Sequence, residues 1–202
     1  MKYLLCTNLA DYDELRIAQC LAAMPPSEIH RIQRTRNLKG RREKVIAYQV
    51  LTDCLRQEGL LHEPPLLNYG CHDKPKLSNY PDVHFNISHC ANAVAVAIDS
   101  NEIGIDVESI RPYKEELSQR VFSPREQHLI SLADDKARIF SQLWTRKEAV
   151  VKCLGTGIVG MESLRAIDVS DDIVILPRHN TLHLTTIPLP NDKGYLTLCQ
   201  PA

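Results

Sequence analysis

The sequence predicts an α+β protein in which helices and strands are mixed along one chain. Two observations support this class. Apolar residues recur at helical spacing over residues 13–56 and 114–154, whereas residues 92–107 and 166–199 contain short strand-like segments. The alternation of these regions favours a chain with two unequal halves rather than an all-helical or all-strand fold.

The first part of the chain is predicted to be mainly helical. Residues 13–23 have apolar side chains at helical spacing, and a pair of prolines ends this segment. Residues 27–56 predict one long helix whose second part carries an apolar stripe. Residues 62–82 are rich in Pro, Asn, His and Asp, which predicts loops around short extended pieces.

A hairpin and three helices are expected next. Residues 92–98 alternate valine or isoleucine with alanine, and a polar turn separates them from residues 103–107, so we expect these two strands to pair. Ser123 followed by proline, with Glu126 in the first turn, is typical of a capped helix start. The predicted helices are 114–121, 124–133 and 136–154, and the predicted later strands are 166–169, 172–176, 181–187 and 194–199.

Charge and composition exclude several classes of protein. With 24 Lys and Arg against 25 Asp and Glu, the net charge of −1 disfavours nucleic acid as a partner, because such binding depends on many cationic phosphate contacts. No apolar run approaches the ~20 residues of a membrane span, and acidic residues follow the apolar start where a signal-peptide cleavage site would lie. We therefore expect a mature chain in the cytoplasm with no membrane partner.

The seven cysteines do not indicate a disulfide framework or a zinc site. Their number is odd and their spacing irregular, which favours reduced thiols. Cys71-His72 and His89-Cys90 place potential zinc ligands side by side. Neither is accompanied by a C-x2-C or H-x3-H pair, so zinc is not expected.

Two acidic residues near the middle of the chain are candidates for metal binding. Asp106 and Glu108 end a predicted strand, where side chains two residues apart point to one face. Neighbouring carboxylates repel each other unless a cation lies between them, and hard oxygen ligands suit Mg²⁺. An Asp-x-Glu pair at a strand end is also common surface chemistry, and this alternative remains open.

A second candidate cluster lies on the last predicted helix. Trp144, Glu148 and Lys152 are spaced by four residues and therefore lie along one side. One interpretation is a surface ion pair of Glu148 and Lys152, which contributes little to stability. The other is a partly buried side that holds a third metal ligand beside a phosphate-binding lysine.

Basic and polar residues earlier in the chain are candidates for phosphate binding. Lys74 precedes Ser88 and His89, which lack the G-x-S-x-G turn of a serine hydrolase and are better suited to donate hydrogen bonds to phosphate. A solvated helix face is the alternative interpretation of the basic segment between residues 30 and 44. That segment contains Arg31, Arg34, Arg36, Lys39, Arg41, Arg42 and Lys44 against the single acid Glu43.

The order of these clusters resembles the Sfp-type 4′-phosphopantetheinyl transferases. The two most specific segments are GIDVE and WTRKEAVVK, and the short length is similar to the compact, AcpT-like members. The resemblance extends over most of the chain and includes Arg41-Arg42, DKP at 73–75, HFNISH at 84–89, GIDVE at 104–108, VFSPRE at 121–126, WTRKEAVVK at 144–152 and Gly194-Tyr195.

This resemblance implies an enzyme that moves the phosphopantetheine arm of coenzyme A to a serine of an apo acyl or peptidyl carrier protein, releasing 3′,5′-ADP. It implies a pseudo-dimer of two similar α/β halves, 1–101 and 102–202, with the active site between them and no need for a second chain, hence a monomer. It also implies that Asp106, Glu108 and Glu148 are the Mg²⁺ ligands and that Glu148 and Lys152 are catalytic. The implied coenzyme A contacts are Arg41, Arg42, Lys74, Ser88, His89 and Lys152.

A docking surface for the carrier protein is also predicted, and two alternative functions remain open. Carrier proteins are usually acidic, so residues 117–130, which mix Arg120, Val121, Phe122 and Arg125, are the predicted docking surface. The alternatives are a magnesium-dependent phosphodiesterase or nuclease and a non-catalytic coenzyme A-binding module.

Overall fold

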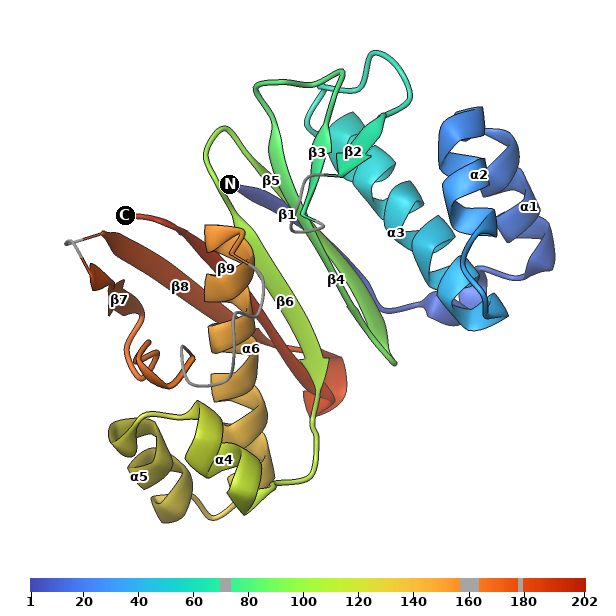
Figure 1. The fold of residues 1–202 in the computed structure, drawn as a ribbon. Coiled ribbons are helices and arrows are strands. Elements are labelled where there is room, and N and C mark those ends of the chain that lie inside the picture. Colours follow the sequence, from blue (N-terminus) through green and yellow to red (C-terminus); the bar gives the residue numbers. More distant parts are fainter. Residues whose placement is uncertain (70–73, 157–163, 178–179) are drawn as a thin grey trace.

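Two antiparallel sheets form the centre of the molecule, which the computed structural model describes over residues 1–69, 74–156, 164–177 and 180–202 (Figure 1). The first sheet has the order β1-β5-β4 and the second has the order β6-β9-β8-β7. A short pair, β2-β3, forms a third sheet that is not hydrogen-bonded to either, and β3 packs beside β4. The strands are β1 Lys2–Cys6, β2 Leu67–Tyr69, β3 Pro75–Leu77, β4 His84–Cys90, β5 Ala93–Asp99, β6 Gly104–Ser109, β7 Ile173–Ile175, β8 Thr181–Pro188 and β9 Gly194–Pro201.

Each sheet has its own group of helices, and the predicted α+β class is confirmed. The helix α3 packs on β5 and β1, whereas α6 packs on β6 and β9 (Figure 1). Within the described ranges, no helix is both long and apolar enough to span a membrane. The helices are α1 Glu14–Ala22, α2 Pro26–Gln33, α3 Leu38–Gln57, α4 Glu115–Val121, α5 Pro124–Leu132 and α6 Lys136–Leu154, with 3-10 turns η1 Leu9–Asp11 and η3 Pro190–Asp192.

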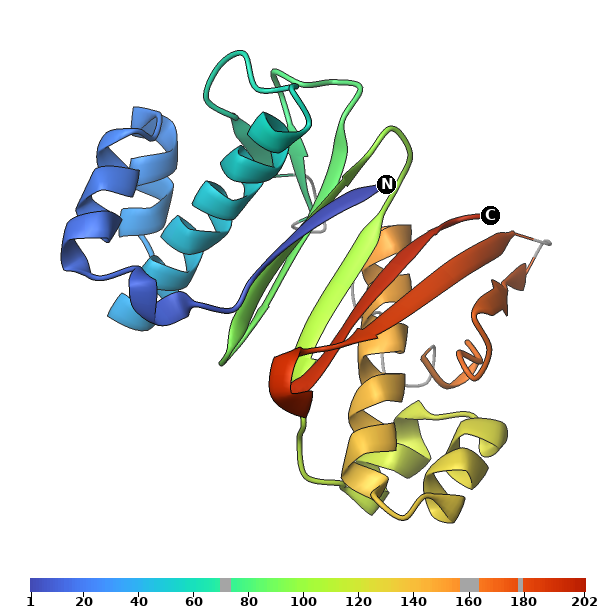
Figure 2. The ribbon, with the colours of Figure 1, turned by 180° about the vertical axis from the view of Figure 1, so that it is seen from behind.

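The same order of elements occurs twice along the chain. In the described ranges, a first strand (β1 or β6) leads into three α-helices, of which the third is the longest, and strands follow. In both parts the last strand, β5 or β9, pairs with the first strand and with the strand that precedes it. The two chain ends stand at the tips of β1 and β9, between the two groups of helices (Figure 2). This order is the one expected of two similar halves.

The alternating sequence of β5 separates two apolar cores. Val94, Val96 and Ile98 belong to the core beneath α3. Ala93 and the other two alanines of the strand point the opposite way, against Ile105 of β6 and apolar residues of β9. Small side chains allow two sheets to approach closely, so this pattern holds the first sheet against β6.

The predicted β5–β6 hairpin is wrong. The turn at Ala91 and Asn92 joins β5 to β4 instead, and β1 takes the other edge of β5. The partner of β6 is β9, in register from Gly104 opposite Cys199. Both edges of β5 are therefore satisfied within its own sheet, and the polar segment after it carries the chain into the second sheet.

The predicted long helix over 27–56 is divided into α2 and α3. The break precedes Asn37, whose side-chain Oδ1 accepts a hydrogen bond from the Gly40 N–H at 2.6 Å and so caps α3. An asparagine in this role favours a new helix start over helix continuation. The other predicted helices are confirmed, including the capping box of Ser123 and Glu126.

The predicted strand over 166–169 is also wrong. The N–H of Val169 donates to Glu126 Oε1 at 2.7 Å, and its carbonyl oxygen accepts from Arg146 Nε at 2.6 Å. Side chains thus satisfy the backbone groups that a strand would use in a ladder. The later predicted strands are confirmed as β7, β8 and β9, whereas β1 and β4 were not predicted.

Candidate active site

Side chains of β4, rather than a backbone ladder, connect the two sheets. The N–H of Ile105 donates to Asn86 Oδ1 at 3.0 Å, and the N–H of Val107 donates to Ser88 Oγ at 3.1 Å. Asn86 and Ser88 are two residues apart and therefore lie on one face of β4. These two buried bonds fix β4 beside β6 and bring the HFNISH segment to the GIDVE segment.

Helix α6 crosses closely over β6 because residue 104 is glycine. A Cβ at Gly104 would lie 2.0 Å from the carbonyl oxygen of Ala149 and 2.5 Å from the backbone nitrogen of Cys153. No residue with a side chain can take this position without moving α6. The contact places the last two turns of α6, which carry Glu148 and Lys152, over the strand that carries Asp106.

Three residues from three elements meet at the centre of this crossing. Lys152 Nζ donates to Asp106 Oδ1 at 2.7 Å and to Ser88 Oγ at 2.9 Å, and Ser88 Oγ lies 2.8 Å from the same Asp106 oxygen. Asp106 is only 6% exposed. Among the described residues, Lys152 pairs with Asp106 rather than with Glu148, so the alternative of a Glu148–Lys152 surface ion pair is wrong.

The carboxylate of Glu108 is held by a residue that was not singled out in the sequence. Arg111 forms an ion pair with Glu108 Oε2, and its guanidinium lies 5.0 Å from the centre of the Trp144 ring. The Arg111 N–H also donates to Ser141 Oγ at 2.9 Å, which ties it to α6. The three-residue spacing from Glu108 was the only signal for this role.

Glu148 lies in an environment that disfavours its charge. Burial and the neighbouring Asp106 carboxylate raise the pKa of Glu148, although Lys152 and Arg111 act in the opposite direction. Burial raises the pKa of Glu108 as well, against the effect of Arg111. In the described part of the chain the Glu148 carboxylate has no hydrogen bond or ion pair. The cluster therefore has more negative charge than its own cations offset.

We expect Glu148→Gln to raise the melting temperature at pH 7. A raised pKa in the folded protein means that ionisation of Glu148 costs stability above its ordinary titration range, and this cost is absent once the group is protonated. The gain should therefore disappear as the pH falls below about 4. Thermal unfolding from pH 3.5 to 8 measures it, with the exposed Glu116→Gln as control. A lower melting temperature for Glu148→Gln at pH 7 would contradict this environment.

The predicted Mg²⁺ ligands are close together but are not arranged as a finished metal site. Across the described ranges, no three His, Cys, Asp or Glu side chains already stand where they could hold an ion. Lys152 forms an ion pair with Asp106, and Arg111 forms an ion pair with Glu108. Uncompensated carboxylate oxygens nevertheless suit a hard dication, so the donor set fits Mg²⁺ provided that the two basic side chains move aside.

Lys74 contacts Cys153, the residue that follows Lys152 near the end of α6. Its Nζ donates to Glu102 Oε2 at 2.6 Å and to the carbonyl oxygens of Ile103 and Cys153 at 3.3 and 3.2 Å. The contacts link the β3 edge to the segment between the sheets and to the C-terminal end of α6. The structure thus brings Lys74 near the centre, where its charge is engaged by Glu102.

The remaining predicted phosphate contacts lie at the start of α3. His89 Nδ1 is 3.9 Å from Glu43 Oε2, which places the end of β4 beside this helix. Arg41 Nε donates to the Thr35 carbonyl oxygen at 2.7 Å, and Arg42 donates to the Leu9 carbonyl oxygen at 2.9 Å. His89 and both arginines therefore border one region, outside the Asp106–Ser88–Lys152 contact.

The predicted docking surface needs correction. Val121 and Phe122 are completely buried in the core around α6 and cannot contact a partner. Arg125 is exposed but pairs with Asp171 at 2.6 Å. Leu129, at 40% exposed, is the large apolar side chain that residues 117–130 do present. Cys71-His72, the other sequence feature considered for zinc, lies outside the described residues.

Two further basic residues of the WTRKE segment are structural. Arg146 donates to the carbonyl oxygens of Val169 and Asp171, and Lys147 forms an ion pair with Glu126 at 2.8 Å. Lys147 and Glu126 are 1% and 0% exposed. Both basic residues were part of a recognised segment, but their burial could not be inferred from charge alone.

Comparison with known proteins finds similarity to one family, over less than half of the chain. Residues 102–190 match the family model described as the 4′-phosphopantetheinyl transferase superfamily. The chain is 40% identical over 87 residues to 4′-phosphopantetheinyl transferase Sfp of Bacillus subtilis (strain 168), a match that covers 42% of this chain and 39% of that protein.

Two other relatives give similar matches. Identity is 40% over 96 residues with 4′-phosphopantetheinyl transferase psf-1 of Bacillus pumilus, covering 46% of this chain and 41% of that protein. It is 35% over 96 residues with 4′-phosphopantetheinyl transferase AcpT of Escherichia coli O157:H7, covering 45% and 49%. In each of these three comparisons the match spans less than half of the relative's own length.

Proposed function

We propose, from the match of residues 102–190 to the 4′-phosphopantetheinyl transferase superfamily model, that this chain transfers phosphopantetheine from coenzyme A to a serine of an apo carrier protein. The products are the holo carrier protein and 3′,5′-ADP. The contact of Ser88, Asp106 and Lys152 carries this proposal, because it joins three of the family-like segments at one partly buried point.

The active site in this proposal lies between two halves, residues 1–101 and 102–202. The repeated order of elements and the separate pairing of β1 with β5 and β6 with β9 support this division. Ser88 comes from the first half, whereas Asp106 and Lys152 come from the second. One chain supplies both sides of the site, which supports a monomer.

The chain's own residues can position and activate both substrates. In the reaction the carrier serine oxygen bonds to the β-phosphorus of coenzyme A while the bond from that phosphorus to the 3′,5′-ADP oxygen breaks. Lys152, released from Asp106, would donate to a phosphate oxygen and offset charge on the departing group. Glu148 would accept the serine proton, directly or through a bound water.

Mg²⁺, when bound, would neutralise pyrophosphate charge, and Asp106, Glu108 and Glu148 would hold it. Lys74 and His89 would bind the nucleotide end of coenzyme A together with Ser88. Arg41 or Arg42 would contact the 3′-phosphate, since both lie on the first turns of α3 near His89.

The proposal includes a cellular compartment and a protein partner. The described cysteines are free thiols, which supports a reducing compartment such as the cytoplasm. The partner is an apo acyl or peptidyl carrier protein, and neither nucleic acid nor membrane is required.

Mass spectrometry separates this function from its alternatives. An apo carrier protein incubated with coenzyme A and Mg²⁺ should gain one phosphopantetheine group, and a panel of acyl and peptidyl carriers should show which is preferred. Cleavage of nucleic acid without transfer would support a phosphodiesterase or nuclease. Binding of coenzyme A without either reaction would support a non-catalytic module.

We expect Arg111→Gln to tighten metal binding by the free protein. Arg111 forms an ion pair with one carboxylate oxygen of Glu108, so a metal ion that binds this oxygen must displace the arginine. A partly exposed ion pair is worth up to ~1 kcal/mol, which corresponds to about a fivefold change in affinity. Mn²⁺ binding followed by electron paramagnetic resonance, without coenzyme A, measures the change.

The matched control for that measurement is Arg120→Gln, which removes the same charge from an exposed position on α4. It should leave Mn²⁺ affinity unchanged. Equal affinities of wild type and Arg111→Gln would show that Arg111 does not compete with the metal, whereas failure of every variant to bind Mn²⁺ would contradict the metal site itself.

A further inference from the structure

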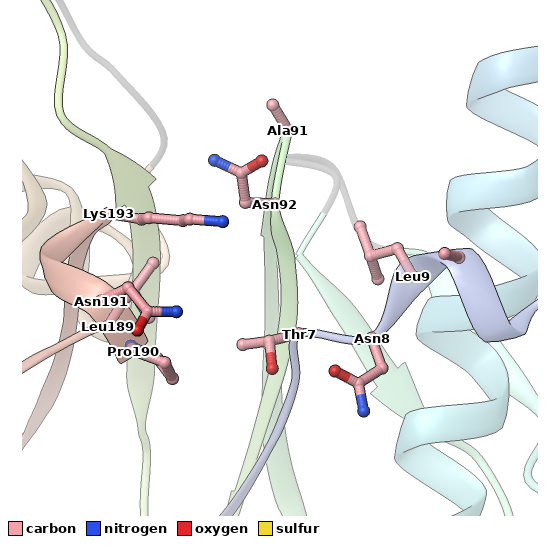
Figure 3. A pocket seen from close by; sticks show the side chains of 10 residues that line it. Thr7, Asn8, Leu9, Ala91, Asn92, Leu189, Pro190, Asn191 and Lys193 are labelled. Atoms are coloured by element: carbon pink, nitrogen blue, oxygen red, sulfur yellow. The ribbon is translucent and has the colours of Figure 1, made fainter.

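A polar pocket of about 380 Å³ lies between the two halves, apart from the candidate active site (Figure 3). Its walls come from the segment that follows β1, from the β4–β5 turn and from the β8–β9 turn. None of its lining residues belongs to the Asp106–Ser88–Lys152 contact. The volume falls within the ~300–1,000 Å³ typical of small-molecule sites.

The charge in this pocket is positive. Lys193 is the charged side chain among the described lining residues, and none of them is an aspartate or glutamate. The neighbouring acid, Asp192, pairs with Arg138 at 3.2 Å and does not line the pocket. Within the described part of the chain, no carboxylate lies within ion-pair distance of Lys193 Nζ. A negatively charged ligand in this pocket would therefore interact with the Lys193 ammonium, whose charge no described carboxylate neutralises.

Amide and hydroxyl groups from both halves surround that cation. Figure 3 shows Lys193 and Asn92 extending toward each other from opposite walls, with the Asn191 amide turned toward Thr7. Asn8 precedes η1 but makes no capping hydrogen bond with its side chain, so the helical turn does not use this amide. Such groups can donate hydrogen bonds to an oxyanion and can also accept them from a hydroxyl or amide of the same ligand.

Two of these groups are held in place before any ligand binds. Asn92 Nδ2 donates to Ser109 Oγ at 3.1 Å, which uses one of its two N–H groups, orients the amide and leaves the second N–H to donate to a ligand. The carbonyl oxygen of Lys193 accepts from the Ile110 N–H at 3.0 Å, and Leu189 N–H donates to the Gly194 carbonyl oxygen at 2.9 Å. The tight β8–β9 turn therefore presents Lys193 from a fixed backbone position.

We propose that this pocket binds a small polar molecule through one carboxylate or phosphate group. Lys193 supplies the charge, the Asn92 and Asn191 amides and Thr7 supply hydrogen bonds, and the bound molecule connects the first half to the second. This site does not depend on the proposed transfer activity, because it shares no residue with that machinery.

Nuclear magnetic resonance titration of the free, 15N-labelled protein tests the site. Inorganic phosphate and acetate are the two probes, added at constant ionic strength to distinguish a phosphate from a carboxylate ligand. The backbone amides of Asn92, Asn191 and Lys193 should shift together and saturate at millimolar concentration with at least one probe. Lys193→Gln should weaken this binding at least tenfold.

Two control variants make the result specific. Lys114→Gln removes an exposed charge elsewhere and should leave the titration unchanged. Lys152→Met should likewise leave it unchanged, because phosphate bound at the candidate active site would not involve these amides. The proposal is overturned if the three amides do not saturate with either probe, if Lys193→Gln binds as wild type does, or if Lys114→Gln weakens binding equally.

Discussion

Asp106→Asn is expected to lower phosphopantetheine transfer by roughly a hundredfold to a thousandfold while the fold stays intact. Asp106 meets both Lys152 and Ser88 and is a predicted metal ligand, so its charge serves the site in two ways. Removal of one such charge contact commonly costs ~3–4 kcal/mol in the transition state. Asparagine keeps the size of the side chain and an oxygen that can accept from Ser88.

The matched control is Asp134→Asn, an exposed acid in the turn before α6. It should transfer at the wild-type rate. Initial rates at limiting and saturating Mg²⁺, with thermal unfolding of each variant, provide the measurement. Near-normal turnover of Asp106→Asn at limiting Mg²⁺ would remove Asp106 from the metal site, and loss of folding together with activity would indicate a structural role.

Lys147→Met is expected to destabilise the protein by about 3–5 kcal/mol, the usual result of breaking a buried ion pair. Lys147 and Glu126 are both inaccessible to solvent, and the variant leaves the Glu126 carboxylate without its 2.8 Å partner. Burial raises the pKa of Glu126 and lowers that of Lys147, so each charge depends on the other. Lys147 Nζ also donates to the Leu164 carbonyl oxygen at 2.8 Å.

Denaturant unfolding of three variants distinguishes this pair from a general loss of packing. Lys147→Met should shift the midpoint strongly, and the exposed Lys114→Met should not. Lys147→Met combined with Glu126→Gln should recover part of the loss, because glutamine leaves no unpaired charge and keeps an oxygen that can accept from the Val169 N–H. A midpoint for Lys147→Met equal to that of wild type would show that the buried pair does not hold α5 to α6.

The sequence predicted best those features that depend on neighbouring residues. The capping box at Ser123 and the end of α6 at Gly155, which has a φ of 65°, follow from local chemistry and were confirmed. The pairing of β5 was mispredicted because alternation shows which face of a strand is buried but not which strand lies beside it. Strand β4 was not predicted, although its apolar and polar residues alternate as in a strand. Its polar Asn86 and Ser88 are buried because both bond to β6, which the sequence alone does not show.

The residues of the candidate site could be predicted from the sequence, but the contacts between them could not. The alternation in GIDVE placed Asp106 and Glu108 on one face, yet it gave no indication that Lys152 would pair with Asp106. Arg111 and the burial of Phe122 depend on how α6 packs against the segments before it, which no local spacing reveals.

We propose that the Asp106–Ser88–Lys152 contact is the centre of a phosphopantetheinyl transferase site. Intact-mass spectrometry of one apo carrier protein, incubated with coenzyme A, Mg²⁺ and either wild type or Lys152→Met, tests it most directly. Wild type should add one phosphopantetheine group to the carrier and none to a carrier whose acceptor serine is alanine, and folded Lys152→Met should add almost none. Equal modification by wild type and Lys152→Met, or no modification of any carrier by wild type, would contradict the claim.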